Sequence, residues 1–142
     1  MIKKLSRIIF FAIFILNFNL LNSSSSFFNE GIILFEKKNY KKSKMFFEKD
    51  IVFNPKSEKS YLYLAKIFKE EKKDTLQENN LDTVLLINPK NEEAIYLLAL
   101  LSIKKSNFSK AKELIGTMNL VCEEFCSSSK ELQKKLDSSL KK

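Results

Sequence analysis

The 142-residue sequence contains no histidine, and it has only two glycines and two prolines. Without histidine there can be no Ser-His-Asp triad, no imidazole base and no histidine ligand for zinc. The glycines, Gly31 and Gly116, are isolated, so the sequence has no glycine-rich loop that could hold a phosphate group. These absences exclude most common enzyme designs, and we expect a non-catalytic protein that needs neither a cofactor nor a metal.

Arginine is nearly absent as well, because Arg7 is the only one in the chain. The formal net charge of +8 is otherwise typical of a nucleic-acid binder. Arginine provides the forked group that contacts phosphate or guanine at two points, and lysine does not replace it. Removing Lys3, Lys4 and Arg7 with an export segment would lower the charge from +8 to +5 and leave no arginine. We therefore expect no nucleic-acid partner.

Residues 1–26 have the layout of a secretory signal peptide, because basic residues precede an apolar stretch and serines follow it at 23–26. The stretch at residues 8–21 is shorter than the roughly 20 residues that span a bilayer. A buried first helix is the alternative, but it fits the basic start poorly. We interpret this segment as a signal peptide or, if uncleaved, an anchor that contacts the membrane only through residues 1–21. The protein is then exported, and is periplasmic or associated with the inner membrane.

An internal repeat is the strongest signal in the chain. Pro55 and Pro89, the only prolines, differ by 34 in position, and their surroundings, VFNPKSE and LINPKNE, match. A second block, NYKKSK at residues 39–44, returns as NFSKAK at 107–112, which is two such periods later. Two matches with the same period indicate stacked copies of one supersecondary unit.

The residues that recur with this period predict a helix–turn–helix unit. Asn-Pro ends a helix because proline disfavours the α conformation of the residue before it. Ser57 and Asn91 follow the prolines and can cap the next helices. Small residues let the first helix approach the second closely; they are Gly31, Ala65 and Ala99. Such a unit cannot bury its apolar faces alone and must stack on its copies.

These residues resemble the tetratricopeptide repeat family over about residues 27–122, or three units. In the first helix, the family's large apolar residue is matched by Phe27, Tyr61 and Ile95, and its small residue by Gly31, Ala65 and Ala99. The aromatic residue of the turn is matched by Tyr40 and Phe108. In the second helix, the alanine is matched by Ser43 and Ala111, its large apolar partner by Phe47, Leu81 and Ile115, and the closing proline by Pro55 and Pro89.

The resemblance implies an all-α fold, a short right-handed solenoid of tetratricopeptide-like helix–turn–helix units with a C-terminal capping helix. A generic helical bundle is the alternative. Three units are expected at residues 27–56, 57–90 and 91–126, and the cap at 127–142. The expected helices are 26–38, 41–54, 57–72, 75–88, 91–105, 108–121 and 129–141.

Departures from the family pattern, and the sequence of the last helix, carry further expectations. Asp74 and Gln77 stand where the turn aromatic and the alanine of the middle unit belong, so we expect its second helix to pack loosely. Glu123 stands where the third closing proline belongs. Ser128, with Glu131 three residues on, predicts a capping box at the start of the last helix. That helix has one apolar stripe, formed by Leu132, Leu136 and Leu140.

In the family, the first helices line a groove that holds partner peptides. The corresponding positions are Phe28, Ile32, Phe35, Leu62, Lys66, Lys69, Tyr96, Leu100 and Ile103. The family's clamp for a free C-terminal carboxylate is missing, because Phe28 and Ile32 stand where it begins with lysine and asparagine. The resemblance therefore implies a groove for an amphipathic helix or an apolar peptide segment of another protein, with some acidic residues. Alternatively, the last helix fills the groove.

The remaining pair of interest is Cys122 and Cys126, the only cysteines. In an exported protein such a pair predicts a disulfide, provided that the turn between them is irregular, and two buried thiols are the alternative. Two ligands without histidine make zinc improbable. Together these features predict a protein–protein interaction scaffold of the bacterial envelope. The alternative is a membrane-anchored structural subunit of an envelope complex whose groove is filled by its own chain.

Overall fold

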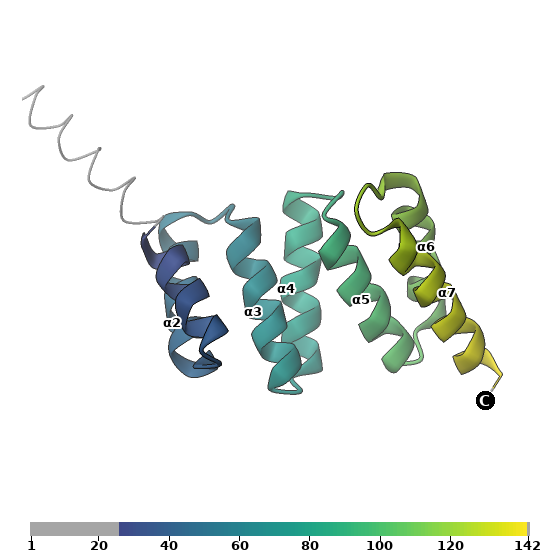
Figure 1. Ribbon diagram of the computed structural model, residues 1–142, viewed down its shortest axis with the longest axis horizontal. Helices are drawn as coiled ribbons and strands as arrows, with labels where there is room; N and C mark the ends of the chain where they lie inside the picture. The colour runs from purple at the N-terminus through teal and green to yellow at the C-terminus, as the bar shows by residue number, and fades with distance from the viewer. Residues whose placement is uncertain (1–25, 142) are drawn as a thin grey trace, which may run out of the picture. The chain divides into compact units, whose positions relative to one another are not determined.

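The computed structural model describes residues 26–141, and these residues are helical apart from short turns, without any strand (Figure 1). The predicted export segment lies outside this range except for Ser26. A first helix covers residues 26–36. It is followed by α2 (Tyr40–Phe53), α3 (Glu58–Glu70), α4 (Asp74–Ile87), α5 (Glu92–Lys104), α6 (Phe108–Val121) and α7 (Cys126–Leu140). The predicted all-α fold is confirmed. Across residues 26–141, each helix is too short or too polar to cross a bilayer.

The helix boundaries follow the repeat period of the sequence. The helices α3, α5 and α7 begin at Glu58, Glu92 and Cys126, each one full period after the one before. The helices α2, α4 and α6 show the same spacing at both of their ends. By its place in the period, α7 is the first helix of a further unit.

The first turn of α7 differs from the predicted one. The helix begins at Cys126, not at residue 129, and its N-cap residue is Phe125, whose side chain makes no capping hydrogen bond. Ser128 therefore lies inside the helix, where its backbone N–H donates to the carbonyl of Phe125 at 2.9 Å. Glu131 forms an ion pair with Lys135 at 2.8 Å instead of returning to a cap. The predicted capping box was wrong because the period places the helix start earlier than the serine run indicates.

The turns inside the helix pairs repeat as closely as the helices do. Lys38, Lys72 and Ser106, again spaced by one period, have positive φ angles of 55°, 56° and 57°. The residue after each donates its N–H five residues back, as Lys73 does to Phe68 at 2.8 Å. This is the bond of a Schellman motif, which satisfies a carbonyl that the helix end leaves open.

Asparagine side chains cap the starts of α2, α5 and α6. Asn39 and Asn107 accept from the N–H groups of Lys42 and Lys110 at 3.3 and 3.2 Å. The predicted cap at Asn91 is present, because its side chain accepts from the N–H of Ala94 at 2.9 Å. Ser57 occupies the equivalent position before α3, but its hydroxyl donates to that of Ser60.

The chain separates into two compact units, Met1–Ser60 and Tyr61–Lys142. In the first unit, the helix at residues 26–36 packs against α2. Gly31 is buried, and its carbonyl accepts from the Ser43 hydroxyl at 2.8 Å. At the other end of this pair, the ring of Phe27 lies 5.5 Å from that of Phe53. Small side chains at the helix crossing therefore allow the close approach that the sequence predicted.

The second unit has one continuous apolar core to which all of its helices contribute. Within it, α5 packs against α4, α6 and α7. The buried core residues are Leu62, Ala65, Leu81, Val84, Ala94, Ile95, Leu97, Leu98, Ala99, Ala111, Leu114, Ile115, Met118, Leu132 and Leu136. Because this core runs through to α7, the last helix is an integral part of the unit.

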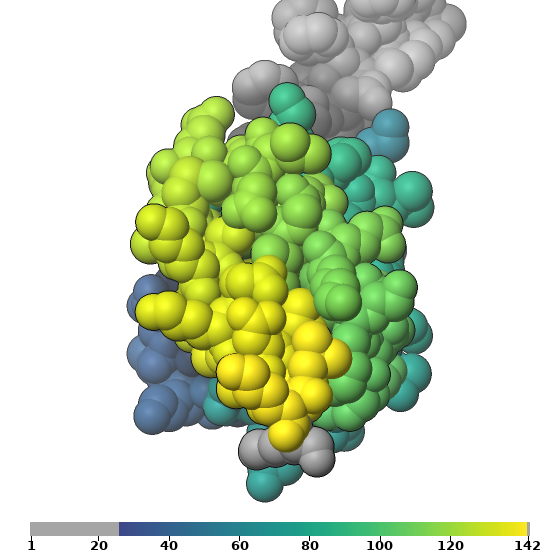
Figure 2. Space-filling view, turned by 90° about the vertical axis from the view of Figure 1, so that its right-hand side faces the viewer, coloured from purple at the N-terminus to yellow at the C-terminus, as the bar shows by residue number. Residues whose placement is uncertain are grey.

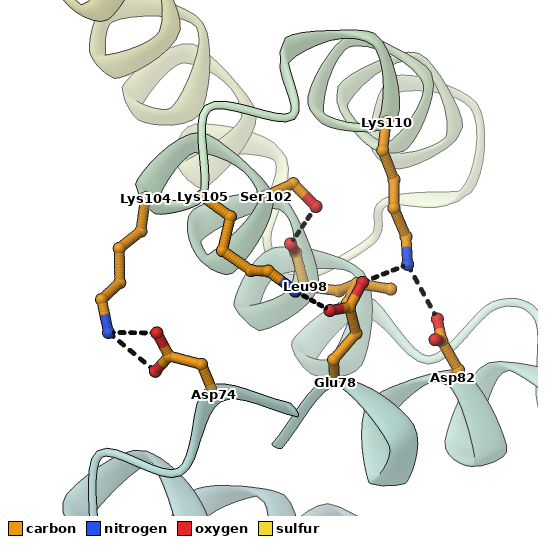
Figure 3. Close-up of polar contacts among 8 residues, drawn as sticks. All are labelled: Asp74, Glu78, Asp82, Leu98, Ser102, Lys104, Lys105 and Lys110. Atoms are coloured by element: carbon orange, nitrogen blue, oxygen red, sulfur yellow. Dashed lines mark hydrogen bonds and ion pairs between the residues drawn. The ribbon is translucent and has the colours of Figure 1, made fainter. Parts of the chain in front are cut away.

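The second helix of the middle unit, α4, is not loosely packed, contrary to expectation. Gln77 takes the place of the usual alanine and is buried, and Leu81 and Val84 are fully buried. Figure 3 shows the polar contacts that accompany this packing: Lys104 with Asp74 at 2.7 Å, Lys105 with Glu78, and Lys110 with Glu78 and Asp82 at 3.0 and 3.2 Å. Hydrogen bonds from Lys105 and Lys110 lower the pKa of the Glu78 carboxyl. Ion pairs to the end of α5 and to α6 thus accompany the packing of α4.

Candidate functional site

The nine predicted groove residues fall in both compact units. Phe28, Ile32 and Phe35 lie on the helix at residues 26–36, and the other six lie on α3 and α5. In the first unit, Phe28 lies 5.8 Å from the ring of Phe47, and Phe35 lies 5.6 Å from that of Tyr40. All three predicted residues are half-buried. Much of their apolar surface is therefore used within their own helix pair.

In the second unit, the predicted groove residues differ in how far their side chains are exposed to solvent. Leu62 is 7% exposed and belongs to the core, so it supports the surface without offering contacts. Leu100 and Ile103 are partly buried against that core and keep one side open. Lys66 forms an ion pair with Glu93 at 2.7 Å, and its ammonium group lies 4.6 Å from the ring centre of Tyr63. Lys69 is exposed.

A pocket of about 260 Å³ opens beside these residues. Its walls come from the end of α3, the start of α4 and the second half of α5. The lining residues are Lys69, Asp74, Gln77, Leu97, Leu100, Leu101 and Lys104. Pockets for whole small molecules usually measure roughly 300–1,000 Å³, so this one suits a single anchoring side chain. Lys104 and Asp74 neutralise each other at 2.7 Å, which leaves Lys69 as the unbalanced charge of the lining.

The helix α7 occupies the surface next to Tyr96. The ring of Phe125 lies 6.1 Å from that of Tyr96, and the Tyr96 hydroxyl lies 3.4 Å from both carboxylate oxygens of Glu131. Leu132 and Leu136 are fully buried, whereas Leu140 is 49% exposed. Figure 2 shows α7, in yellow, packed along the green residues of the helices before it. The chain thus covers the Tyr96 part of the predicted groove with its own last helix.

Cys122 and Cys126 form a disulfide across the turn between α6 and α7. Their Cα atoms are 5.1 Å apart. Cys122 ends α6 in an extended conformation, with φ −65° and ψ 134°, and Cys126 begins α7. The turn is therefore irregular, which is the condition that the sequence set for pairing.

Glu92 holds the same turn, although its place beside Glu93 in the sequence indicates only a solvated helix face. Its carboxylate accepts from the N–H groups of Glu123 at 2.8 Å, Phe125 at 2.6 Å and Glu124 at 3.2 Å. These backbone hydrogen bonds, that from Glu123 first, lower the pKa of the Glu92 carboxyl. The signal was present in the departure at Glu123, because a proline there would have no N–H to donate.

This pKa shift predicts the pH dependence of the turn. Because the pKa of Glu92 is lower in the folded state, its hydrogen bonds stabilise the turn fully above the ordinary value of 4.5. The stabilisation is lost as the pH falls through the lowered pKa of Glu92 in the folded protein. Over that pH range we expect the amides of residues 123–125 to lose protection against hydrogen exchange, after correction for the intrinsic pH dependence of exchange. Glu92→Gln should remove that step, and an unchanged step would contradict the assignment.

Residues 26–141 contain no group of three or more cysteine, aspartate or glutamate side chains placed to hold a metal ion. The site therefore consists of an apolar surface on α3 and α5, a small pocket with a lysine in its lining, and a covering helix. These elements suit contact with another chain.

Comparison with known proteins agrees with this architecture. The chain matches no family model and no curated protein. It is similar to the solved tetratricopeptide repeat domain of OM64 from Arabidopsis, with 18% identity, a TM-score of 0.75, and coverage of 84% of this chain and 98% of that one. It is also similar to the first such domain of Spaghetti (RPAP3), bound to the HSP90 peptide SRMEEVD, with 14% identity, a TM-score of 0.75, and coverage of 85% and 95%.

A third similar structure is the type III secretion chaperone SycD of Yersinia enterocolitica in complex with a peptide of the translocator YopD. It has 11% identity and a TM-score of 0.74, and the match covers 84% of this chain and 93% of that one. The fold of the chain is therefore the tetratricopeptide-like all-α fold that the repeat predicted.

Proposed function

We propose that this protein is a binding module that holds an apolar segment of a partner protein against α3 and α5. The observation that carries the proposal is the pocket of about 260 Å³, whose leucine walls lie beside the predicted groove residues Lys69 and Leu100. The peptide complexes of Spaghetti and SycD support it, because both have this fold.

The partner's chemistry follows from the surface. Leu97, Leu100 and Leu101 offer an apolar anchor site, and burying one leucine-sized side chain stabilises a complex by roughly 1.5–3 kcal/mol before the costs of binding. Lys69 is exposed beside it. A helix or extended segment with one buried apolar residue and acidic neighbours fits this arrangement. Charge complementarity would chiefly set specificity and the rate of association.

One observation favours the second candidate, a structural subunit whose groove is filled by its own chain. At Tyr96 the surface is covered by Phe125 and Glu131 of the last turn and helix. This covering does not include the pocket lining, because α7 contributes no residue to it. We therefore place partner binding at the Leu100 end and internal packing at the Tyr96 end.

We further propose that the protein works in the bacterial envelope, as a periplasmic or inner-membrane-associated protein. The basic and apolar start of the sequence and the Cys122–Cys126 disulfide support export, because disulfides persist in oxidising compartments. Fractionation of cells tests this. Recovery in the periplasmic or membrane fraction is expected, and recovery in the cytosol with free thiols would contradict it.

Peptide binding is tested by selecting ligands from a displayed peptide library and measuring their affinities by calorimetry. We expect the selected peptides to share an apolar residue with acidic neighbours. Lys69→Glu should weaken their binding by about threefold to tenfold, where tenfold corresponds to about 1.4 kcal/mol, with helicity unchanged. Lys112→Glu, an equal charge reversal at an exposed position of α6, is the matched control and should have little effect. Equal effects of the two variants would contradict the proposed site.

A further inference from the structure

The turn between α6 and α7 is closed in two ways at once. The Cys122–Cys126 disulfide joins its ends, and the Glu92 carboxylate of α5 accepts N–H groups from all three residues between the cysteines. Glu92 is only partly buried, so water competes for these hydrogen bonds. Ordering three backbone amides around such a carboxylate costs conformational entropy, which the covalent link reduces in advance.

The same turn also carries a residue that contacts the predicted groove. Phe125 donates its N–H to Glu92 at 2.6 Å, and its ring lies 6.1 Å from that of Tyr96. The hydrogen bond from the Phe125 backbone to Glu92 therefore fixes the position of the Phe125 ring against Tyr96.

The rest of α7 is held independently of the turn. Leu132 and Leu136 are fully buried in the core, and the Ser129 hydroxyl bonds the Asn119 side chain at 2.5 Å. Opening of the disulfide would therefore release the turn and leave the helix docked.

We propose that the disulfide and Glu92 form a redox-sensitive clasp, which holds Phe125 against Tyr96 when oxidised and frees it when reduced. The part that concerns partner affinity rests on the proposed function. In the reducing step, one thiolate of a small dithiol attacks a sulfur of the disulfide and forms a mixed disulfide. The second thiolate of the dithiol then displaces the other cysteine. The protein gains two thiols, and the dithiol becomes a cyclic disulfide. Oxidation by a disulfide compound reverses the exchange.

Hydrogen exchange of the full chain, with and without dithiothreitol, tests the clasp directly. We expect reduction to lower the protection of the amides of residues 123–125 about tenfold, while amides in the middle of α5 keep theirs. The double variant Cys122→Ser with Cys126→Ser should resemble the reduced protein and ignore the reductant. Glu92→Ala should lower protection at the same amides with the disulfide intact. Equal protection in the oxidised and reduced chains would overturn the clasp.

Calorimetry with a library-selected peptide adds the second readout. Tyr96 lies one helical turn before Leu100 on α5, so release of Phe125 should loosen the surface beside the pocket. We therefore expect reduction to weaken binding about threefold to tenfold, and the double serine variant to bind equally with and without dithiothreitol. Faster exchange with unchanged affinity would overturn the link between the clasp and the groove. A chain that binds no selected peptide in either redox state would contradict the proposed function, and the exchange experiment alone would then decide the clasp.

Discussion

Replacing Leu98 with alanine is expected to lower the free energy of unfolding by about 2–5 kcal/mol. Leu98 is 1% exposed and lies on α5, which packs against α4, α6 and α7, so the shortened side chain leaves a cavity in the core of the second unit. Because small proteins are stable by only about 5–15 kcal/mol, the loss is a large share of the total. Urea unfolding followed by circular dichroism measures it.

Leu86 provides the matched control for this prediction. It is also a helical leucine, but it is 84% exposed near the end of α4. Leu86→Ala should change the free energy of unfolding by no more than about 0.5 kcal/mol. If Leu86→Ala cost as much as Leu98→Ala, the packing described for the second unit would be wrong.

The two glycines should respond to alanine with opposite signs. A Cβ atom at Gly31 would lie 2.6 and 2.8 Å from the Cε1 and Cδ1 atoms of the Phe47 ring, which is fully buried. We expect Gly31→Ala to destabilise by about 1–3 kcal/mol. At Gly116, on the exposed side of α6, nothing lies within 4 Å of the added atom, so Gly116→Ala should stabilise by roughly 0.5–1 kcal/mol. Unfolding in urea gives both values.

The repeat itself suggests how to rescue the first variant. The later units combine alanine with a smaller partner at the positions of Gly31 and Phe47, namely Ala65 with Leu81. Phe47→Leu should therefore reduce the cost of Gly31→Ala when the two are combined, giving a favourable coupling in a double-mutant cycle. Additive effects would contradict the close contact in the first unit.

The sequence was sufficient to predict the helices because the residues that end them and let them cross recur with one period. The Asn-Pro pairs at Pro55 and Pro89, and the small residues at Gly31, Ala65 and Ala99, defined where helices end and cross. The start of α7 was predicted late because Glu123 replaces the third proline and the serine run resembles a cap. The period alone, continued from Glu58 and Glu92 to Cys126, would have located it.

Other features depend on contacts that no local pattern encodes. The packing of α4 is accompanied by ion pairs such as Lys110 with Asp82, which join residues 28 positions apart. The pocket likewise requires the end of α3 and the second half of α5 to meet around Gln77. The covering of Tyr96 follows from the path of the α6–α7 turn, which Glu92 fixes across 31 to 33 positions. Such long-range contacts become visible only in the folded chain.

Exposed aliphatic residues outside the proposed site also recur with the period of 34 residues. Val52, Leu86 and Leu120 are 74%, 84% and 87% exposed, each at the same place near the end of a second helix. They lie outside the pocket lining. Within the second unit, Leu86 and Leu120 therefore serve as reference positions for contact away from the pocket.

Nuclear magnetic resonance of the full chain, titrated with a library-selected peptide, separates these surfaces most directly. Binding against α3 and α5 predicts that the largest backbone amide shifts occur around Lys69, Leu100 and Ile103. The largest shifts around Leu86 and Leu120, or a uniform absence of shifts at saturating peptide, would contradict the proposed binding surface.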